Sequence, residues 1–180
     1  VNTFIYDWYW FDNRPYLENC LNDGFLGAEN RNKMQFYLMW ANHDANNYWN
    51  INLSDDYGDT VIWQGAVGRG AFETVADRVI NKYFLQPNYY KIDGKPVFMI
   101  YDVVNMIEGL GGMENARRCI EEFRAKVVAA GHPGLELQLM QMGEAIFNVT
   151  GVDGNAGRIS TTEVIRGLGF DSLTNYQFVS

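Results

Sequence analysis

Short apolar runs alternate along the chain with longer segments in which apolar residues recur at helical spacing. The short runs predict β-strands, and the longer segments predict amphipathic helices. The predicted strands are residues 3–10, 34–42, 95–102, 135–144 and 170–178. The predicted helices follow the first four strands and lie within residues 13–25, 71–85, 112–131 and 160–169.

Local signals mark the ends of several of these elements. The last predicted helix begins with Ser160 and carries Glu163 three positions later, which is the pattern of a capping box. The third predicted helix is followed by Gly131, which favours the end of a helix. Asp93 and Gly94 form a hairpin signal, so we expect a short antiparallel strand just before the third predicted strand.

The alternation of strands and helices predicts an α/β fold with a parallel sheet. The glycine-rich stretches at 65–70 and 109–112 lack the spacing of a dinucleotide-binding fingerprint, which disfavours a doubly wound sheet. We therefore expect one domain over residues 1–180, a (β/α)8 TIM barrel present as a partial barrel of about five βα units. One strand at the amino end and further strands at the carboxyl end would be missing.

Composition narrows the class of protein. Of the 180 residues, 47% are hydrophobic and 20% are charged, as in an ordinary globular domain. The formal charge of -8, without runs of lysine or arginine, lacks the positive patch of a nucleic-acid-binding protein. No apolar run reaches the roughly 20 residues that span a bilayer. Cys20 and Cys119 lack metal-ligand spacing; they are free thiols or a disulfide, and we expect no cofactor.

The carboxyl ends of the predicted strands are rich in amides, carboxylates and aromatic rings. Such groups hydrogen-bond to a polyol or stack on its C–H faces, and 15% of the chain is aromatic. Because barrel active sites are assembled at these strand ends, we predict a site for an uncharged carbohydrate. The candidates are Asp7, Trp8, Tyr9, Trp10, Trp40, Asn42, His43, Asp44, Tyr101, Asp102, Asn105, Gln141, Glu144, Asn175, Tyr176 and Gln177.

Each candidate has a second interpretation. Trp8 and Trp10 lie two positions apart and point to the same face of a strand, which is either the barrel interior or the layer beneath the helices. His43 precedes Asp44, but one histidine without a second ligand does not predict a metal site. Glu144 is either one of the paired carboxylates that glycoside cleavage needs or a plain loop glutamate.

Three stretches, FIYDWYWFDNRPYLE, FYLMWAN and KYFLQPNYYKIDGKPVFMIYD, resemble successive blocks of the glycoside hydrolase family 99-like domain, also called the WbsX-type family. The resemblance implies a (β/α)8 barrel. It also implies cleavage of α-mannosidic or related linkages in complex glycans, or an association with cell-surface polysaccharide biosynthesis. By this resemblance, the residues around the sugar groove are Tyr6, Trp8, Trp10, Trp40, Asn42, Tyr101, Asp102 and Tyr176.

Two departures from the family pattern affect the expected function. After the WAN motif the family has a glutamate, where this chain has His43 and Asp44. The family's catalytic glutamates lie in a motif later than Tyr176. We therefore expect a glycoside hydrolase whose groove lies in this chain, with Glu144 as the in-chain candidate for a catalytic carboxylate. The alternatives are a non-catalytic glycan-binding or polysaccharide-biosynthesis protein on the same fold, and a structural barrel whose rings are all core.

The expected partners follow from this hypothesis. They are an oligosaccharide or polysaccharide substrate and the remaining segments of the barrel, which would cover the open strand edges. Nucleic acid and a membrane span are not expected. Analogy with exported glycan-degrading enzymes implies an extracytoplasmic location, either periplasmic, at the cell surface or secreted.

Overall fold

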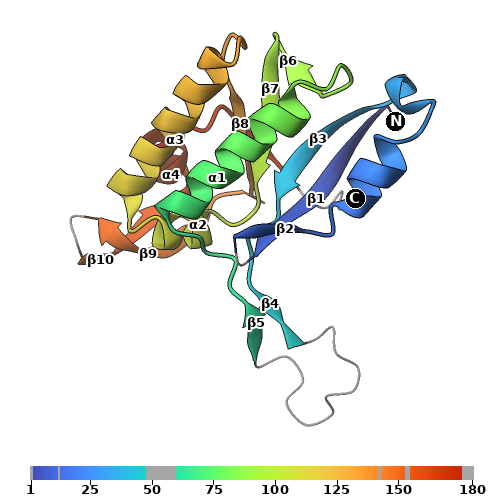
Figure 1. The fold of residues 1–180 in the computed structure, drawn as a ribbon. Helices are drawn as coiled ribbons and strands as arrows, with labels where there is room; N and C mark the ends of the chain where they lie inside the picture. The colour runs from blue at the N-terminus through green and yellow to red at the C-terminus, as the bar shows by residue number, and fades with distance from the viewer. Residues whose placement is uncertain (1, 12, 48–59, 142, 153–154, 176–180) are drawn as a thin grey trace.

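The computed structural model describes residues 2–11, 13–47, 60–141, 143–152 and 155–175, and its centre is a seven-stranded sheet (Figure 1). Five strands of this sheet are parallel, and each lies next to the preceding one in chain order. They are β1 (Thr3–Phe11), β3 (Gln35–Trp40), β7 (Lys95–Ile100), β8 (Glu136–Met140) and β11 (Ser172–Thr174). The predicted α/β fold with a parallel sheet is confirmed, and the predicted part of the last strand beyond residue 175 lies outside the described residues.

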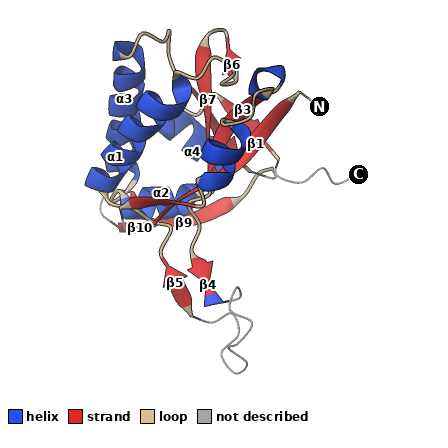
Figure 2. Ribbon diagram, turned by 45° about the vertical axis from the view of Figure 1, so that its right-hand side comes forward, coloured by secondary structure: helices blue, strands red, loops and turns tan. Residues whose placement is uncertain are grey.

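Three helices lie side by side on one face of this sheet (Figure 2). They are α1 (Arg69–Val79), which continues into the π-helical turn η4 (Ile80–Phe84), α3 (Met113–Ala129) and α4 (Thr161–Leu168). Aromatic side chains pack the apolar sides of α1 and α3 against the strands. The ring centroids of Trp40 and Phe72 are 5.9 Å apart, and those of Phe98 and Phe123 are 5.6 Å apart. The predicted helices within 71–85, 112–131 and 160–169 are therefore confirmed.

Helix α4 begins and ends where its sequence signals predict. The Ser160 hydroxyl accepts from the Glu163 backbone N–H at 3.2 Å, and the Glu163 carboxylate accepts from the Ser160 backbone N–H at 2.8 Å. The Ser160 hydroxyl also donates to the Glu163 carboxylate at 2.7 Å, and the two bonds that this carboxylate accepts from Ser160 lower the pKa of Glu163. Gly169 ends the helix with a φ of 70°, a left-handed conformation that glycine adopts without steric cost. The capping box is confirmed in both halves.

Several elements differ from the sequence prediction. Where one helix was expected at 13–25, the chain first turns back and pairs antiparallel with the end of β1, and a short π-helix follows. A helix and a hairpin occupy segments that were expected to be loops, and a second two-stranded pair lies in the long segment after β3. These elements are β2 (Arg14–Tyr16), η1 (Cys20–Phe25), α2 (Val103–Gly109), β9 (Ile146–Val152) with β10 (Asn155–Ser160), and β4 (Ala45–Asn46) with β5 (Val61–Trp63). The predicted hairpin at Asp93 and Gly94 is confirmed, since β6 (Lys91–Ile92) pairs antiparallel with β7.

Alternate residues of each strand point to opposite faces of the sheet. In the register of the parallel strands, Trp8 lies beside Trp40 and Trp40 lies beside Ile100, and all three are buried on the face that α1 and α3 cover. Tyr9 and Tyr101 come one position after Trp8 and Ile100, so their side chains point to the opposite face. The sheet therefore separates two groups of aromatic residues that are neighbours in sequence.

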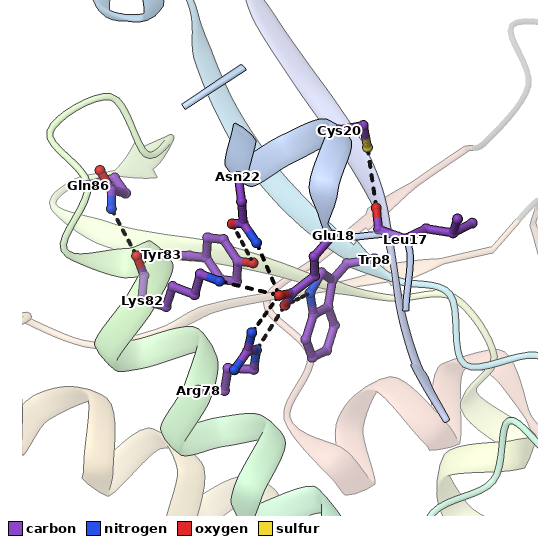
Figure 3. A network of polar contacts seen from close by, with 9 residues as sticks. All are labelled: Trp8, Leu17, Glu18, Cys20, Asn22, Arg78, Lys82, Tyr83 and Gln86. Carbon is purple, nitrogen blue, oxygen red and sulfur yellow. Dashed lines mark hydrogen bonds and ion pairs between the residues drawn. The ribbon is translucent and has the colours of Figure 1, made fainter. Parts of the chain in front are cut away.

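A buried carboxylate ties the amino-terminal part of the fold to α1, as Figure 3 shows. Glu18 is 7% exposed and accepts hydrogen bonds from Trp8 Nε1 at 2.8 Å and from Arg78 Nε and Nη2 at 2.8 and 2.5 Å. Lys82 Nζ lies 3.3 Å from the same carboxylate, and Asn22 Nδ2 lies 3.2 Å from it. Burial alone would raise the pKa of Glu18, but the hydrogen bonds from Arg78 and Trp8 lower it to about 2. The network fixes Trp8 as a core residue.

Candidate functional site

A continuous row of rings crosses the carboxyl ends of the strands. Its members come from β1, β2, β5 and the segments that follow β3 and β7, and we call them the ring row: Tyr101, His43, Tyr9, Phe11, Trp63 and Tyr16. Their centroids are 5.3 Å apart for Tyr101 and His43, 5.9 Å for His43 and Tyr9, and 6.1 Å for Tyr9 and Phe11. Trp63 stacks on Phe11 at 5.0 Å and contacts Tyr16 at 4.9 Å. Five separate segments thus bring their rings to one place.

A cavity of about 230 Å³ opens along this row, and we call it the ring-lined cavity. It lies where β4 and β5 project from the body of the molecule (Figure 1). Its wall contains every member of the ring row except Tyr101, together with Leu17, Ala45, Asn46 and Ile62. Among the residues that the structure describes, the wall contains no aspartate, glutamate, lysine or arginine. The cavity therefore suits an uncharged ligand with a flat apolar face.

The side chain of Asn42 holds the ends of β3 and β7 together. Its Nδ2 donates to the carbonyl oxygen of Asp102 at 2.6 Å, and its Oδ1 accepts from the Asp102 backbone N–H at 2.8 Å. Asn105 Nδ2 donates in turn to the Asn42 carbonyl oxygen at 3.0 Å. Asn42 is 2% exposed, so these bonds are shielded from water. These hydrogen bonds place His43 and Tyr101 beside each other, because His43 directly follows Asn42 and Tyr101 directly precedes Asp102.

Asp44 holds the segment that carries Trp63 back against the strand ends. Its Oδ1 accepts from the backbone N–H of Gly65 at 2.8 Å and lies 3.4 Å from Asn105 Nδ2. A Cβ atom on Gly65 would lie 2.2 Å from the Asn42 carbonyl oxygen, so only glycine permits this approach. Asp44 therefore positions the Trp63 wall of the ring-lined cavity.

The hydrogen bond that His43 makes fixes its tautomer. Nδ1 lies 2.8 Å from the carbonyl oxygen of Asp44, and a carbonyl only accepts, so Nδ1 is the donor. In the neutral ring the proton is then on Nδ1, and Nε2 is an acceptor. His43 lines the cavity edge-on to Tyr9 and Tyr101, with angles of 84° and 61° between the ring planes. Nε2 of the neutral ring can thus accept a hydrogen bond from a ligand hydroxyl.

A family model described as Glycosyltransferase WbsX matches residues 1–169. The chain belongs to the WbsX family. This confirms the resemblance found in the sequence and connects the chain to carbohydrate chemistry. Comparison with curated proteins gave no match, and comparison with solved structures gave none.

Four of the aromatic residues predicted for the groove of this WbsX domain have packing roles in the structure. Trp8, Trp10 and Trp40 are 2%, 3% and 0% exposed, and they lie in the core beneath the helices. Tyr6 packs between Phe25 and Phe36, and its pKa is raised by burial. The helices cover the face with Tyr6, Trp8 and Trp10, which is the second of the two interpretations that the sequence left open for Trp8 and Trp10. A contact between these rings and a glycan stays a prediction.

The other predicted residues divide between the rim and the framework. Asp7 is exposed on the face of β1 that also carries Tyr9, while Asp102 caps α2 by accepting from the Asn105 backbone N–H at 2.9 Å. The backbone N–H of Gln141 donates to the Thr174 carbonyl oxygen at 3.0 Å. Glu144 lies before β9, where its carboxylate accepts from the Thr162 hydroxyl at 3.2 Å. It is not among the residues that line the ring-lined cavity. Tyr176 and Gln177 lie outside the described residues.

Three residues of the ring row were missed by the sequence analysis. Phe11 follows Tyr9 by two positions, and this alternation was the signal that could have placed both rings on one face. Tyr16 was assigned to a helical segment, and Trp63 lies in a stretch without periodicity. No local pattern predicts that β2 and β5 meet.

The described part of the chain shows no group of three or more His, Cys, Asp or Glu side chains that could hold a metal ion. Among the same residues, no helix has both the length and the apolar character needed to cross a bilayer. Cys20 is exposed and Cys119 is buried, and both are free thiols.

Proposed function

We propose that this protein binds a glycan and that the ring-lined cavity holds one of its sugars. The ring row is the observation that supports this most, because the C–H face of a sugar packs on aromatic rings while its hydroxyls need hydrogen-bond partners. His43 Nε2 is available as such a partner at the wall of the cavity. Membership of the WbsX family supports the same class of ligand.

The charge of the site favours a neutral glycan over a nucleotide-activated sugar. A diphosphate is bound by arginine, lysine or a metal ion in most sites that accept it. Within the part of the chain that the structure describes, neither lysine nor arginine lines the ring-lined cavity, and the whole chain has a formal charge of -8. The proposed ligand is therefore the glycan itself.

Hydrolysis of α-mannosidic or related linkages is the activity that we propose, in keeping with the family resemblance. Such cleavage uses two carboxyl groups that flank the scissile bond. Asp7 is exposed and shares a face of β1 with Tyr9, which adds it to Glu144 as an in-chain candidate.

A second candidate function is glycan binding without cleavage. The carboxylates beside the ring row serve the backbone: Asp44 accepts from Gly65, and Asp102 caps α2. Glu144 is engaged with Thr162 in the same way. The engagement of these three carboxylates in the framework favours recognition over cleavage.

The strand order supports a partial (β/α)8 barrel as the architecture. Five parallel strands follow one another in space as they do in sequence, with α1, α3 and α4 on one face. In such a barrel the opposite face is the interior, and the site lies at the carboxyl ends, as the ring row does. Further strands of the same barrel would pair with β11 and with the part of β1 that precedes Tyr9.

The proposal is tested by binding and turnover together. We expect an α-linked mannobiose to bind, measured by calorimetry, and Trp63→Ala to weaken binding at least about tenfold. Phe4→Ala is the control, since Phe4 is an aromatic residue that is 44% exposed but lies on the helix side of β1. Turnover of an aryl α-mannoside that Asp7→Asn or Glu144→Gln abolishes, with binding kept, supports hydrolysis. Binding without turnover supports recognition alone. If Trp63→Ala leaves the affinity unchanged, both candidate functions of the ring-lined cavity are contradicted.

A further inference from the structure

A second cavity adjoins the ring-lined cavity across the indole of Trp63. Its volume is about 440 Å³, and we call it the amide-lined cavity because Asn13 and Gln64 are its polar side chains. The remaining wall is formed by Ile62, Trp63 and the backbone and small side chains of Ala66, Val67, Gly68 and Ala71 at the start of α1. Ile62 and Trp63 line both cavities, so one tryptophan stands between an aromatic chamber and a polar one.

The two chambers differ in chemistry in a way that suits two parts of one ligand. The ring-lined cavity offers flat apolar faces, and its volume is below the roughly 300 Å³ at which pockets begin to enclose drug-sized ligands. The amide-lined cavity is larger and offers amide groups that both donate and accept hydrogen bonds. Of the described residues, no lysine, arginine, aspartate or glutamate lines either cavity.

The wall between the chambers is held rigidly. Phe11 stacks on Trp63 with 27° between the ring planes, and Tyr16 contacts the same indole at 4.9 Å. The Gly65 backbone N–H, two positions after Trp63, is bound to Asp44. A side chain fixed in this way loses little freedom when a ligand binds against it, which favours its use as a recognition surface.

We propose that the two chambers are adjacent subsites for consecutive sugars of one neutral glycan, with Trp63 at the junction. This rests on the proposed glycan function and adds that the ligand has at least two sugars. The first sugar packs on the rings of the ring-lined cavity. The next sugar passes the indole of Trp63 and hydrogen-bonds through its hydroxyls to Asn13 and Gln64.

The test compares chain lengths. Mannose, glucose and galactose and their α-linked disaccharides are titrated into the whole chain by calorimetry. We expect at least one disaccharide to bind about tenfold or more tightly than its monosaccharide. Gln64→Ala is expected to lower the affinity for the disaccharide toward that for the monosaccharide. The affinity for the monosaccharide is expected to stay unchanged. Asn13→Gly is expected to do the same, and glycine keeps the backbone unstrained at the φ of 61° found there.

Gln35→Ala is the matched control, because Gln35 is an exposed amide at the opposite, amino-terminal end of β3. It is expected to change neither affinity. Equal affinities for a disaccharide and its monosaccharide would overturn the two-subsite proposal while leaving sugar binding intact. A Gln64→Ala variant that weakens both ligands equally would overturn it as well. Binding of no sugar in the panel would instead contradict the proposed function itself.

Discussion

Asn42 and Asp102 are joined by two hydrogen bonds between one amide side chain and one peptide backbone, at 2.6 and 2.8 Å. The pair connects the ends of two neighbouring parallel strands, and it decides that His43 and Tyr101 meet. The first polar residue after β3 therefore serves the framework, and His43, which follows it, lines the ring-lined cavity.

Asn42→Ala is expected to lower the free energy of unfolding by about 1–3 kcal/mol, because the Asp102 backbone N–H loses its partner and the Asp102 carbonyl oxygen keeps only the Met106 N–H. Urea unfolding followed by circular dichroism measures this. Asn30→Ala is the control, since Asn30 is exposed and makes no side-chain capping bond, and its effect should stay within about 0.5 kcal/mol. Equal effects of the two substitutions would contradict the framework role of Asn42.

Gly65→Ala is expected to destabilise the fold by about 1–3 kcal/mol, because the new methyl group would overlap the Asn42 carbonyl oxygen. Gly70→Ala is its counterpart in α1, where no atom lies within 4 Å of the added Cβ, and a gain of about 0.5–1 kcal/mol is expected. Thermal unfolding of the two variants and the parent measures both changes in stability. A Gly65→Ala variant as stable as the parent would show that the segment carrying Trp63 is not held closely.

Glu18→Gln tests the buried network through its pH dependence. The pKa of Glu18 is lowered from 4.5 to about 2 in the folded protein, so its charge stabilises the fold above about pH 4.5, and this contribution is lost as the pH falls toward 2. The variant should be less stable than the parent by about 2–3 kcal/mol at pH 7. The difference should shrink steadily in urea unfolding at pH 4 and pH 3. A difference that is constant with pH would exclude the charge of Glu18 as its cause.

The strands and the helices α1, α3 and α4 could be predicted from the sequence because their signals are local. Apolar spacing and the Ser160 capping box need no knowledge of the rest of the chain. Helix α2 was missed because Asp102 was interpreted as a site residue, whereas its carboxylate caps that helix. The hairpin of β9 and β10 was missed because its strands lack a strong apolar pattern.

The candidate site was harder to predict for a geometric reason. Alternation along β1 separates Trp8 and Trp10 from Tyr9 and Phe11, but the sequence does not say which face the helices cover. The larger rings suggested the sugar groove, and the structure buries them. Trp63 could not be found at all, because its place beside Phe11 depends on a contact between residues far apart in the chain.

His43→Phe is expected to weaken sugar binding about tenfold, since the substitution keeps a ring against Tyr9 and Tyr101 and removes the Nε2 acceptor. The loss of the exposed Nδ1 bond to Asp44 is expected to lower stability by no more than about 1 kcal/mol. Calorimetric titration of the parent and the variant with the same disaccharide measures the change. The thermal midpoint of each protein serves as the control for folding. Unchanged affinity would mean that His43 contributes its ring surface alone.

The central claim is that the ligand binds on the ring row and not on the tryptophans beneath the helices. Nuclear magnetic resonance of the tryptophan indole N–H groups, assigned by single Trp→Phe variants, tests it during titration with an α-linked disaccharide. We predict that the Trp63 resonance moves with saturating ligand while those of Trp8 and Trp40 stay in place. Movement of the Trp8 or Trp40 resonance with a stationary Trp63 signal would contradict the account.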